Sequence, residues 1–489
     1  MDTEPRLDTE PRPTWLERLR AIPRGVWGFM VLLFLLLSPL LVRTWFLSQV
    51  PDIGDPFDVA AFCKSMEVPS DQDALPVYRN ACRLFTSVQE SRGRSEPAQE
   101  RTDSVLKQGW SVADDSVKEW VAVHEPSLRE WKRAAEMDQI RFDPLENLNG
   151  RYAIELRPLR LAFVRLAQLK GRQCEEQNNF AEAFEWYRAR LRSRRRASFS
   201  LHLYERDLHD LLHWASLPEV TADQLNTALG QLRRDHAALQ PTSDEIKKEY
   251  IQAMNSLRDH DGLAMAIRYR SGHQTDMHER EALVWRSLYR LVGEPERTRR
   301  IYQHVTANYL REIDQPAASR QKLFPATTLL YSDNPTGSLP PGHFSAGQIS
   351  RAIRASAISH NLESHGRGSD FLLHNGAEGM FLHEARAYPV LLELTMALQA
   401  HHRVHGDFPA MLDELVPTYF DSVPIDPCDP NLLSVRYKND GLGQVTLWSV
   451  GSNGTDENGF RDFLSGDVGL DVRAPNKENG AVPPAASKP

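Results

Sequence analysis

The histidines of the C-terminal third have the spacing that comes closest to a metal site. His401 and His405 are four residues apart, so a helix would place both imidazoles on one face, a spacing that Zn²⁺ can use. No third ligand is evident, and histidines in the last turn of a helix also interact favourably with its dipole. His383-Glu384 begins an HExxH signature, but Ala387 stands where the second histidine would be. The spacing therefore favours ordinary helix-end histidines over a zinc site.

A second group of histidines lies in a stretch that we expect to form long loops. Residues 324–343 are rich in Pro, Gly, Ser and Asp, and Gly-containing turns follow them. His360, His365 and His374 come next along the chain. Because active sites often lie on loops, one hypothesis is a membrane-tethered hydrolase with its site in residues 324–375.

Other signatures of catalysis are missing from the sequence. It contains no GxSxG, no P-loop and no GxGxxG after a predicted strand. The paired carboxylates Asp114-Asp115 and Glu175-Glu176 have positions typical of solvated helix surfaces. We therefore expect a protein without catalytic residues, with the hydrolase as the alternative.

Composition and charge narrow the class of protein. The chain has 489 residues, of which 25% are charged and 41% apolar, as in globular proteins of two or three domains. Its net charge of −8 gives no reason to expect nucleic acid as a partner. The four cysteines form no CxxC, which excludes a common zinc framework: Cys63, Cys82, Cys174 and Cys428. In an exported chain Cys63 and Cys82 could pair, although two buried thiols are the simpler interpretation.

A run of arginines could attract phosphate, a heparin-like polymer or anionic lipid. Its members are Arg188, Arg190, Arg192, Arg194, Arg195 and Arg196. We expect a solvated helix end instead, because cations near a helix C-terminus are favoured by the dipole.

Near the N-terminus an uncharged stretch, GVWGFMVLLFLLLSPLLV, is long enough to cross a bilayer as a helix. We predict a transmembrane signal anchor at residues 25–47, with the lipid bilayer as its partner. Arg18, Arg20 and Arg24 precede the stretch. These charges predict a protein of the inner membrane with a cytoplasmic N-terminus and an extracytoplasmic body. Residues 1–24, with a repeated DTEPR, are expected to be disordered.

Residues 51–380 are predicted to form a helical domain, with loops near residues 89–100 and at Pro126. Two apolar stripes at helical spacing predict a hairpin over residues 156–191. Gly171, Phe180, Ala183 and Tyr187 make it similar to one tetratricopeptide repeat, although Ala167 stands where that family has Trp. No second copy follows at the 34-residue period, so we expect an irregular helical bundle.

Residues 381–473 are predicted to form a small α+β module. Pro389 would open a helix over residues 390–405, and Gly406 would end it. A short helix near residues 411–415 precedes two strands, at residues 433–438 and 444–450, joined by Asn439-Asp440-Gly441. Residues 451–469 are expected to be a loop, and residues 474–489 a disordered tail. The helix would cover one face of an antiparallel sheet.

This order of elements resembles the globular part of the major pseudopilin of type II secretion systems. The matching residues are Gly406-Asp-Phe-Pro409, Leu412 to Val416, Pro424-x-Asp426-Pro427, Tyr437, Gly441 and Ser449-Val450-Gly451-x-x-Gly454. The whole layout is also similar to a group of uncharacterised bacterial proteins with an anchor, a helical middle and such a tail. The prepilin-peptidase processing site is absent, so filament assembly is not expected.

The resemblance also implies a calcium ion in the last loop. Carried over by position, Val450 would supply a carbonyl and Asn453 a side-chain oxygen, with carboxylates from Asp456, Asp467 or Asp471. The alternative is an acidic, solvated loop held by glycine turns.

The main functional hypothesis is an envelope protein with a single membrane span that binds or scaffolds an unknown envelope protein. The resemblance alone suggests a further alternative, an accessory component of a secretion or pilus-like system.

Overall fold

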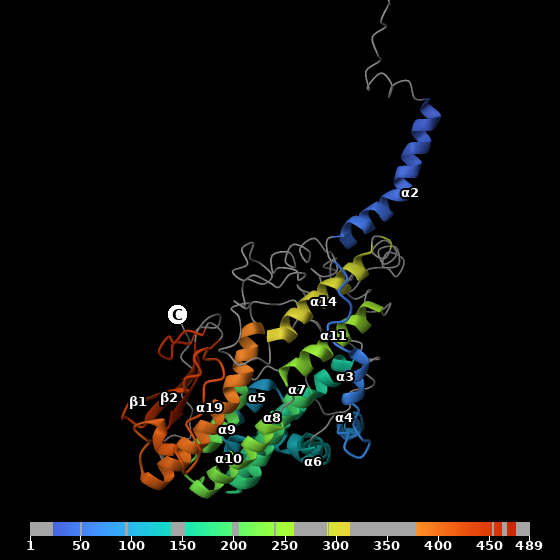
Figure 1. The fold of residues 1–489 in the computed structure, drawn as a ribbon. Coiled ribbons are helices and arrows are strands. Elements are labelled where there is room, and N and C mark those ends of the chain that lie inside the picture. The colour runs from blue at the N-terminus through green and yellow to red at the C-terminus, as the bar shows by residue number, and fades with distance from the viewer. Residues whose placement is uncertain are drawn as a thin grey trace, which may run out of the picture.

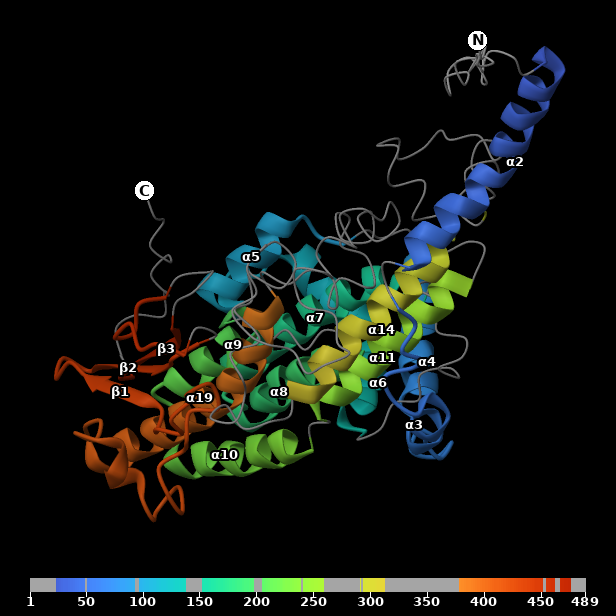
Figure 2. The same ribbon diagram turned by 45° about the horizontal axis from the view of Figure 1, so that its top comes forward.

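The computed structural model describes residues 23–48, 51–92, 96–137, 152–197, 205–238, 241–258, 291, 293–312, 378–451, 454–461 and 467–475. Within these ranges the chain is mainly helical, with one three-stranded antiparallel sheet near its C-terminus. Figures 1 and 2 place the first helix and the sheet at opposite ends of the molecule. The predicted fold class, mainly helical with a small α+β region and an N-terminal apolar helix, is confirmed at this level.

Helix α2 (Arg24–Ser48) has the length and the composition of a membrane span. Its apolar stretch covers 22 residues, Arg24–Trp45, and none of it is buried against the rest of the described chain. At about 1.5 Å per residue such a helix crosses a hydrocarbon core of about 30 Å. The helix is therefore compatible with a membrane anchor or a signal peptide.

The end of α2 is built into the helical body. Helices α11 (Thr242–Arg258) and α14 (Glu294–Glu312) pack together beside it. Arg300 donates from Nη1 to the Leu47 carbonyl at 3.0 Å, and His304 Nε2 lies 2.9 Å from the Pro51 carbonyl oxygen. The segment after α2 is held further by Arg299 on Asp52 and Tyr250 on Asp55. The end of α2 and residues 51–55 are thus held against α11 and α14.

The first bundle has an aromatic core. It consists of α4 (Leu75–Arg92), α5 (Gln99–Gln108), a 3₁₀ turn η1 (Trp110–Val112) and α6 (Asp115–Glu136), whereas the short helix α3 (Val59–Ser65) contacts α11 through Phe62 and Lys247. The imidazole of His124 stacks on Phe85 with ring centroids 4.1 Å apart, and Trp131 stacks on Phe163 at 5.9 Å. The three regularly spaced tryptophans of this region are buried, as core aromatics should be: Trp110, Trp120 and Trp131.

The loop predicted at Pro126 is wrong, because α6 runs through that residue without a break. Trp120 and His124 before the proline and Leu128 and Trp131 after it are all buried on the same face. Burial of this face outweighs the one backbone hydrogen bond that proline cannot donate.

Helices α7 (Tyr152–Glu176) and α8 (Phe180–Ala197) form the predicted hairpin. Asn178 turns the chain between them with a positive φ of 56°, which Asn tolerates better than most residues. Gly171 lies under the ring of Tyr187, so close that a Cβ there would be 2.2 Å from Cε1. The hairpin is thus drawn together at a position where only glycine fits.

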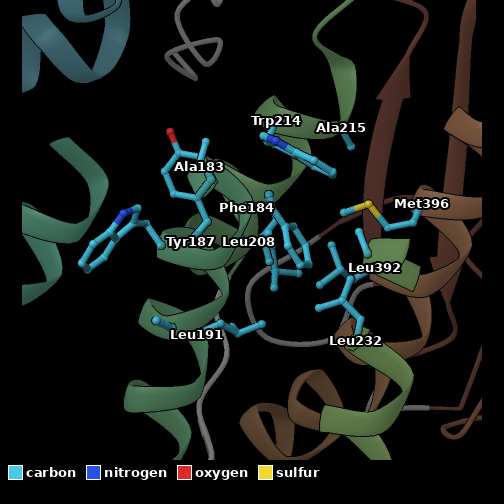
Figure 3. Close-up of a cluster of buried hydrophobic side chains, with 14 of the residues drawn as sticks. Ala183, Phe184, Tyr187, Leu191, Leu208, Trp214, Ala215, Leu232, Leu392 and Met396 are labelled. Carbon is cyan, nitrogen blue, oxygen red and sulfur yellow. The ribbon is translucent and has the colours of Figure 1, made fainter. Parts of the chain in front are cut away.

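Helices α9 (Glu205–Ser216), α10 (Ala222–Ala237) and α19 (Glu378–His405) join the helical body to the C-terminal region. A capping box of Thr221 and Gln224 opens α10. Figure 3 shows side chains of α8, α9, α10 and α19 meeting in one cluster, with Phe184 and Leu208 beside Leu392. The helical body and the C-terminal region therefore share a continuous hydrophobic core.

Helix α19 begins twelve residues before the predicted start, and Pro389 lies inside it. Tyr388, Leu391 and Leu392 are buried around the proline, so tertiary packing carries the helix through it. Gly406 ends the helix with a φ of 88°, as predicted.

The sheet has the order β1-β2-β3, from β1 (Arg436–Asn439), β2 (Gln444–Ser449) and β3 (Val468–Arg473). Tyr437 pairs with Leu447, and Leu447 with Leu470 on the other side. Helix α19 packs beside the sheet, and the short 3₁₀ helix η4 (Leu412–Leu415) contacts α19. Strand β3 occupies residues at the end of the predicted loop, so that loop is shorter than expected.

At three joints of the described chain an arginine donates to carbonyl groups at the C-terminal end of another helix. Besides Arg300 on α2, Arg192 of α8 caps α6 at Ala135 and Glu136. Arg403 of α19 donates to the carbonyl of Ala215 in the last turn of α9, and to the carbonyls of Leu217 and Val220 in the loop between α9 and α10. Carbonyl groups in the last turn of a helix have no partner within that helix, and the negative end of the dipole favours a cation.

Candidate functional site

The loop before β1 contains two buried aspartates. Asp426 has no exposed surface and accepts hydrogen bonds from Cys428 N–H, Ser449 Oγ–H and Val450 N–H at 2.6–2.9 Å. Asp429 is 1% exposed and accepts from Asn431 N–H at 2.6 Å. Asp426 thus fastens its loop to the end of β2, where the loop after β2 begins.

Arg436, the first residue of β1, lies among three carboxylates. Its Nη1 is 3.4 Å from Asp426 Oδ2, its Nε is 3.4 Å from Asp456 Oδ2, and its Nη2 contacts Asp429. Burial disfavours the charge of Arg436, but the hydrogen bond and charge of Asp429, followed by Asp426, outweigh burial and raise its pKa. We call Arg436 with these three aspartates the arginine clamp.

The loop after β2 is closed at its far end by Asp467. This carboxylate is buried and accepts from Gly459 N–H at 2.7 Å and Glu457 N–H at 3.1 Å. Burial raises the pKa of Asp467 to about 6, and the neighbouring Glu457 carboxylate adds to the shift, whereas the two N–H groups oppose it. Asp467 is therefore a group that titrates within the loop itself.

The residues proposed for calcium are distributed over different interactions. Val450 donates its N–H to Asp426, and Asn453 lies outside the described residues. Asp456 accepts from Trp448 Nε1 at 2.9 Å besides its contact with Arg436. Asp471 on β3 pairs with Arg461 at 2.7 Å and accepts from Thr446.

The fit to a calcium ion can be tested on these contacts. Calcium takes six or more oxygen ligands, and carboxylates supply its charge. Two of the candidate carboxylates already hold an arginine, and no three His, Cys, Asp or Glu residues converge on a metal position within the described ranges. The described residues therefore do not fit the ion as a set.

No family model, curated protein or solved structure matches this chain. Proposals about its function therefore depend on the geometry of its own residues.

The prediction of a solvated arginine run is wrong where the side chains are described. Arg190 and Arg192 are 6% and 8% exposed, and Arg188 is half-buried. Arg188 donates to both oxygens of Asp235 at 2.7 and 2.8 Å, Arg192 contacts the same carboxylate, and Arg190 pairs with Asp210. These arginines tie α8 to α9 and α10. The partners are 20 to 47 residues away in sequence, so no local pattern indicated them.

Glu175, expected on a solvated surface, lies in a polar cluster between α7, α8 and α9. It accepts from Tyr187 Oη at 2.8 Å and contacts Arg172 at 3.0 Å and His213 at 3.5 Å. Burial opposes the charge of Glu175, but His213 and Arg172 outweigh it and lower its pKa. Burial raises the pKa of Tyr187. The cluster has the residue types of an acid–base site, yet Tyr187, Arg172 and His213 all contact Glu175 itself, as in a structural network.

The structure describes the side chains of His401 and His405 but not those of the other histidines singled out in the sequence. His401 lies 4.2 Å from His405 between ring centroids, and its Nδ1 is 3.1 Å from the Asp407 carbonyl oxygen, so this pair faces a backbone group. The side chains of His383 and Glu384 are not described, and His360, His365 and His374 lie outside the described residues.

None of the cysteines, all of them described, is in a disulfide, so the alternative of a Cys63–Cys82 bridge is wrong.

The C-terminal module also exposes apolar side chains beside the clamp. Ile425, Leu432 and Leu433 are about half exposed and neighbour each other, since Ile425 bridges to Ser434. Leu432 has a φ of 58°, an unfavourable conformation for a residue with a bulky side chain. We call these three exposed residues the apolar tip.

Residues 381–473 contain 14 acidic and 6 basic side chains. The difference is a charge of −8, the same as the net charge of the whole chain.

Proposed function

We propose that this chain is an envelope protein with a single membrane span, which holds its acidic C-terminal module away from the bilayer to bind a partner protein. The observation that carries the proposal is the construction of α2: its apolar residues are exposed throughout, while its last turn is fixed to α14. A cleaved signal peptide would gain nothing from such a joint. The positive charges before α2 favour a cytoplasmic N-terminus and an extracytoplasmic body.

The apolar tip supports a binding role for the module. Exposed apolar residues surrounded by polar ones are typical of protein interaction sites. The excess of acidic residues in the module favours a partner with basic residues around its contact surface. The helix packed beside an antiparallel sheet also supports the description of the module as pseudopilin-like.

Membrane topology tests the first part of the proposal. Alkaline phosphatase fused to the C-terminus should be active, because this enzyme folds outside the cytoplasm. Green fluorescent protein fused at the same position should not fluoresce, because it does not fold there. The matched control replaces Arg18, Arg20 and Arg24 by Glu, which removes the charge asymmetry and should lower phosphatase activity. A fluorescent, phosphatase-inactive parent pair would contradict the proposed orientation.

Extraction tests whether α2 is retained. The full chain should remain with membranes in alkaline carbonate, and a chain beginning at residue 51 should be soluble. A shortened product that lacks α2 in cells would show cleavage and contradict the anchor.

Partner capture tests the binding role. Crosslinking followed by purification from solubilised membranes should recover a reproducible partner with the parent chain and lose it with Ile425→Asp/Leu433→Asp. Leu442→Asp is the control, because Leu442 is 89% exposed on the β1–β2 turn, away from the apolar tip. Equal recovery with both variants would contradict a role for the tip.

A further inference from the structure

The arginine clamp joins three segments that are separate in sequence. Asp426 and Asp429 belong to the loop before β1, Arg436 begins β1, and Asp456 lies in the loop after β2. Arg436 also donates from Nη1 to the Ser434 carbonyl at 2.9 Å. A single guanidinium therefore holds both loops against the sheet.

The carboxylates of the clamp require a cation. Asp426 and Asp429 are buried, and burial of several like charges is costly unless a positive charge is present among them. Three carboxylates from two loops are also the ligand type that calcium uses when it fastens loops. The same arrangement can thus be completed by a metal ion or by a side-chain cation, and here Arg436 fills it.

We infer that the guanidinium of Arg436 performs in this chain the structural role that the pseudopilin resemblance assigns to calcium, so that the loop after β2 closes on a cation built into the chain. The remaining contacts agree with this assignment. Asp456, which the resemblance offers to the ion, is held by Arg436 and Trp448. The far end of the loop is closed by Asp467 on backbone N–H groups.

The substitution has a physical consequence. A calcium ion dissociates when its free concentration falls, whereas a guanidinium stays charged at every relevant pH and cannot leave. The folded module should therefore be indifferent to calcium and to chelators. Removal of Arg436 should expose a latent cation site made of Asp426, Asp429 and Asp456.

Thermal unfolding of the detergent-solubilised full chain tests the inference. The parent should give the same midpoint in chelator and in millimolar calcium. Arg436→Ala should lower the midpoint of the module, and calcium should restore part of the loss with half-effect at about 10⁻⁴–10⁻³ M, the range of weak extracellular sites. Amide exchange of β2 and β3 reports the module separately from the helical body.

Terbium gives a second readout, because this calcium analogue luminesces when a nearby tryptophan transfers energy to it. Trp448 Nε1 is 2.9 Å from Asp456 Oδ1, so an ion in the latent site would lie beside the indole. Arg436→Ala should show sensitised luminescence and the parent should not. Arg436→Ala/Asp456→Asn should lose most of the signal and of the calcium effect.

Arg461→Ala is the matched control, since it removes an arginine from the partly exposed Asp471 in the same module. It should create no calcium response. A parent chain that loses stability in chelator, or binds terbium as Arg436→Ala does, would overturn the inference. So would an Arg436→Ala variant with an unchanged midpoint and no calcium response. Should Arg436→Ala fail to fold even in calcium, the chelator measurement on the parent decides alone.

Discussion

In the first helical bundle and in the C-terminal module, burial shifts the pKa of an ionisable group in opposite directions. In the bundle His124 is stacked on Phe85 and edge-on to Trp120, and burial lowers its pKa to about 4. In the module Asp467 lies beside Glu457, and burial raises its pKa to about 6. Burial disfavours the charged form in both, so the histidine stays neutral down to a lower pH and the aspartate stays neutral up to a higher pH than in water. The same acidification should therefore weaken one region and strengthen the other.

The two regions also differ in what holds them together. The bundle relies on aromatic and aliphatic packing, whereas the module adds to its packed apolar residues the arginine clamp, which includes Asp426. Packing is spread over many contacts, but the clamp concentrates its effect in a few residues. Single substitutions should reveal this difference most directly.

The largest effect is expected for Asp426→Ala in the module. The change leaves two backbone N–H groups, a hydroxyl and part of the Arg436 guanidinium without their acceptor. We expect a loss of about 3–5 kcal/mol in the free energy of unfolding of the module, measured by amide exchange of β2 and β3. Asp413→Ala, at an exposed position of η4, is the control with little expected effect. Equal losses in the two variants would contradict the central place of Asp426.

The next largest effect is expected when acid destabilises the first helical bundle by protonating His124. Because the pKa of His124 is lowered from 6.5 to about 4 in the folded state, its contribution is complete above pH 6.5 and is lost as the pH falls through 4. Amide exchange of α4 and α6 should show a loss of about 2–3 kcal/mol over this range. His124→Phe should remove the dependence. Persistence of the same slope in that variant would assign it to other groups.

The joint between the two regions can be weakened at Arg403. Arg403→Ala leaves carbonyl groups at the end of α9 and in the loop after it without this donor, and should cost about 1–2 kcal/mol. Since body and module share a core, exchange should rise on both sides of the joint, in α9 and in α19. A change confined to α19 would show that the two regions unfold independently.

The smallest effect is expected for Asp467→Asn. The folded-state pKa of Asp467 is raised from 3.8 to about 6, so its favourable contribution is present below pH 3.8 and lost as the pH rises through 6. An amide keeps an acceptor for the N–H groups without the charge. We expect a gain of at most about 1 kcal/mol at neutral pH after allowance for solvent screening. A loss of stability that depends on calcium would favour the metal instead.

The sequence predicted the elements whose signals are local. The apolar stretch of α2, the stripes of α7 and α8 and the Gly406 cap depend on neighbours within a few residues. The predictions at Pro126 and Pro389 were wrong because both helices continue through the proline. The packing that outweighs the proline comes from other helices, which a local pattern does not show. Strand β3 was missed because a glycine and an aspartate interrupt its short apolar pattern.

The site was predicted only in part. Asp456 and Asp467 were singled out as ligands, and the structure places them in the loop after β2. Arg436 was not singled out, because its role depends on a loop that returns to it from twenty residues further along. The two aspartates of Asp426-Pro-Cys-Asp429, a few residues before an arginine, were the only available hint.

The joint between α2 and α14 has a consequence for how a partner would be found. For a chain anchored by α2, the fixed connector prevents the module from sweeping through solution as it would on a flexible linker. The module would then travel only by lateral diffusion of the anchor and by rotation about the bilayer normal. Encounters would be confined to a thin layer at one height above the lipid, so a partner must present its own contact surface at that height.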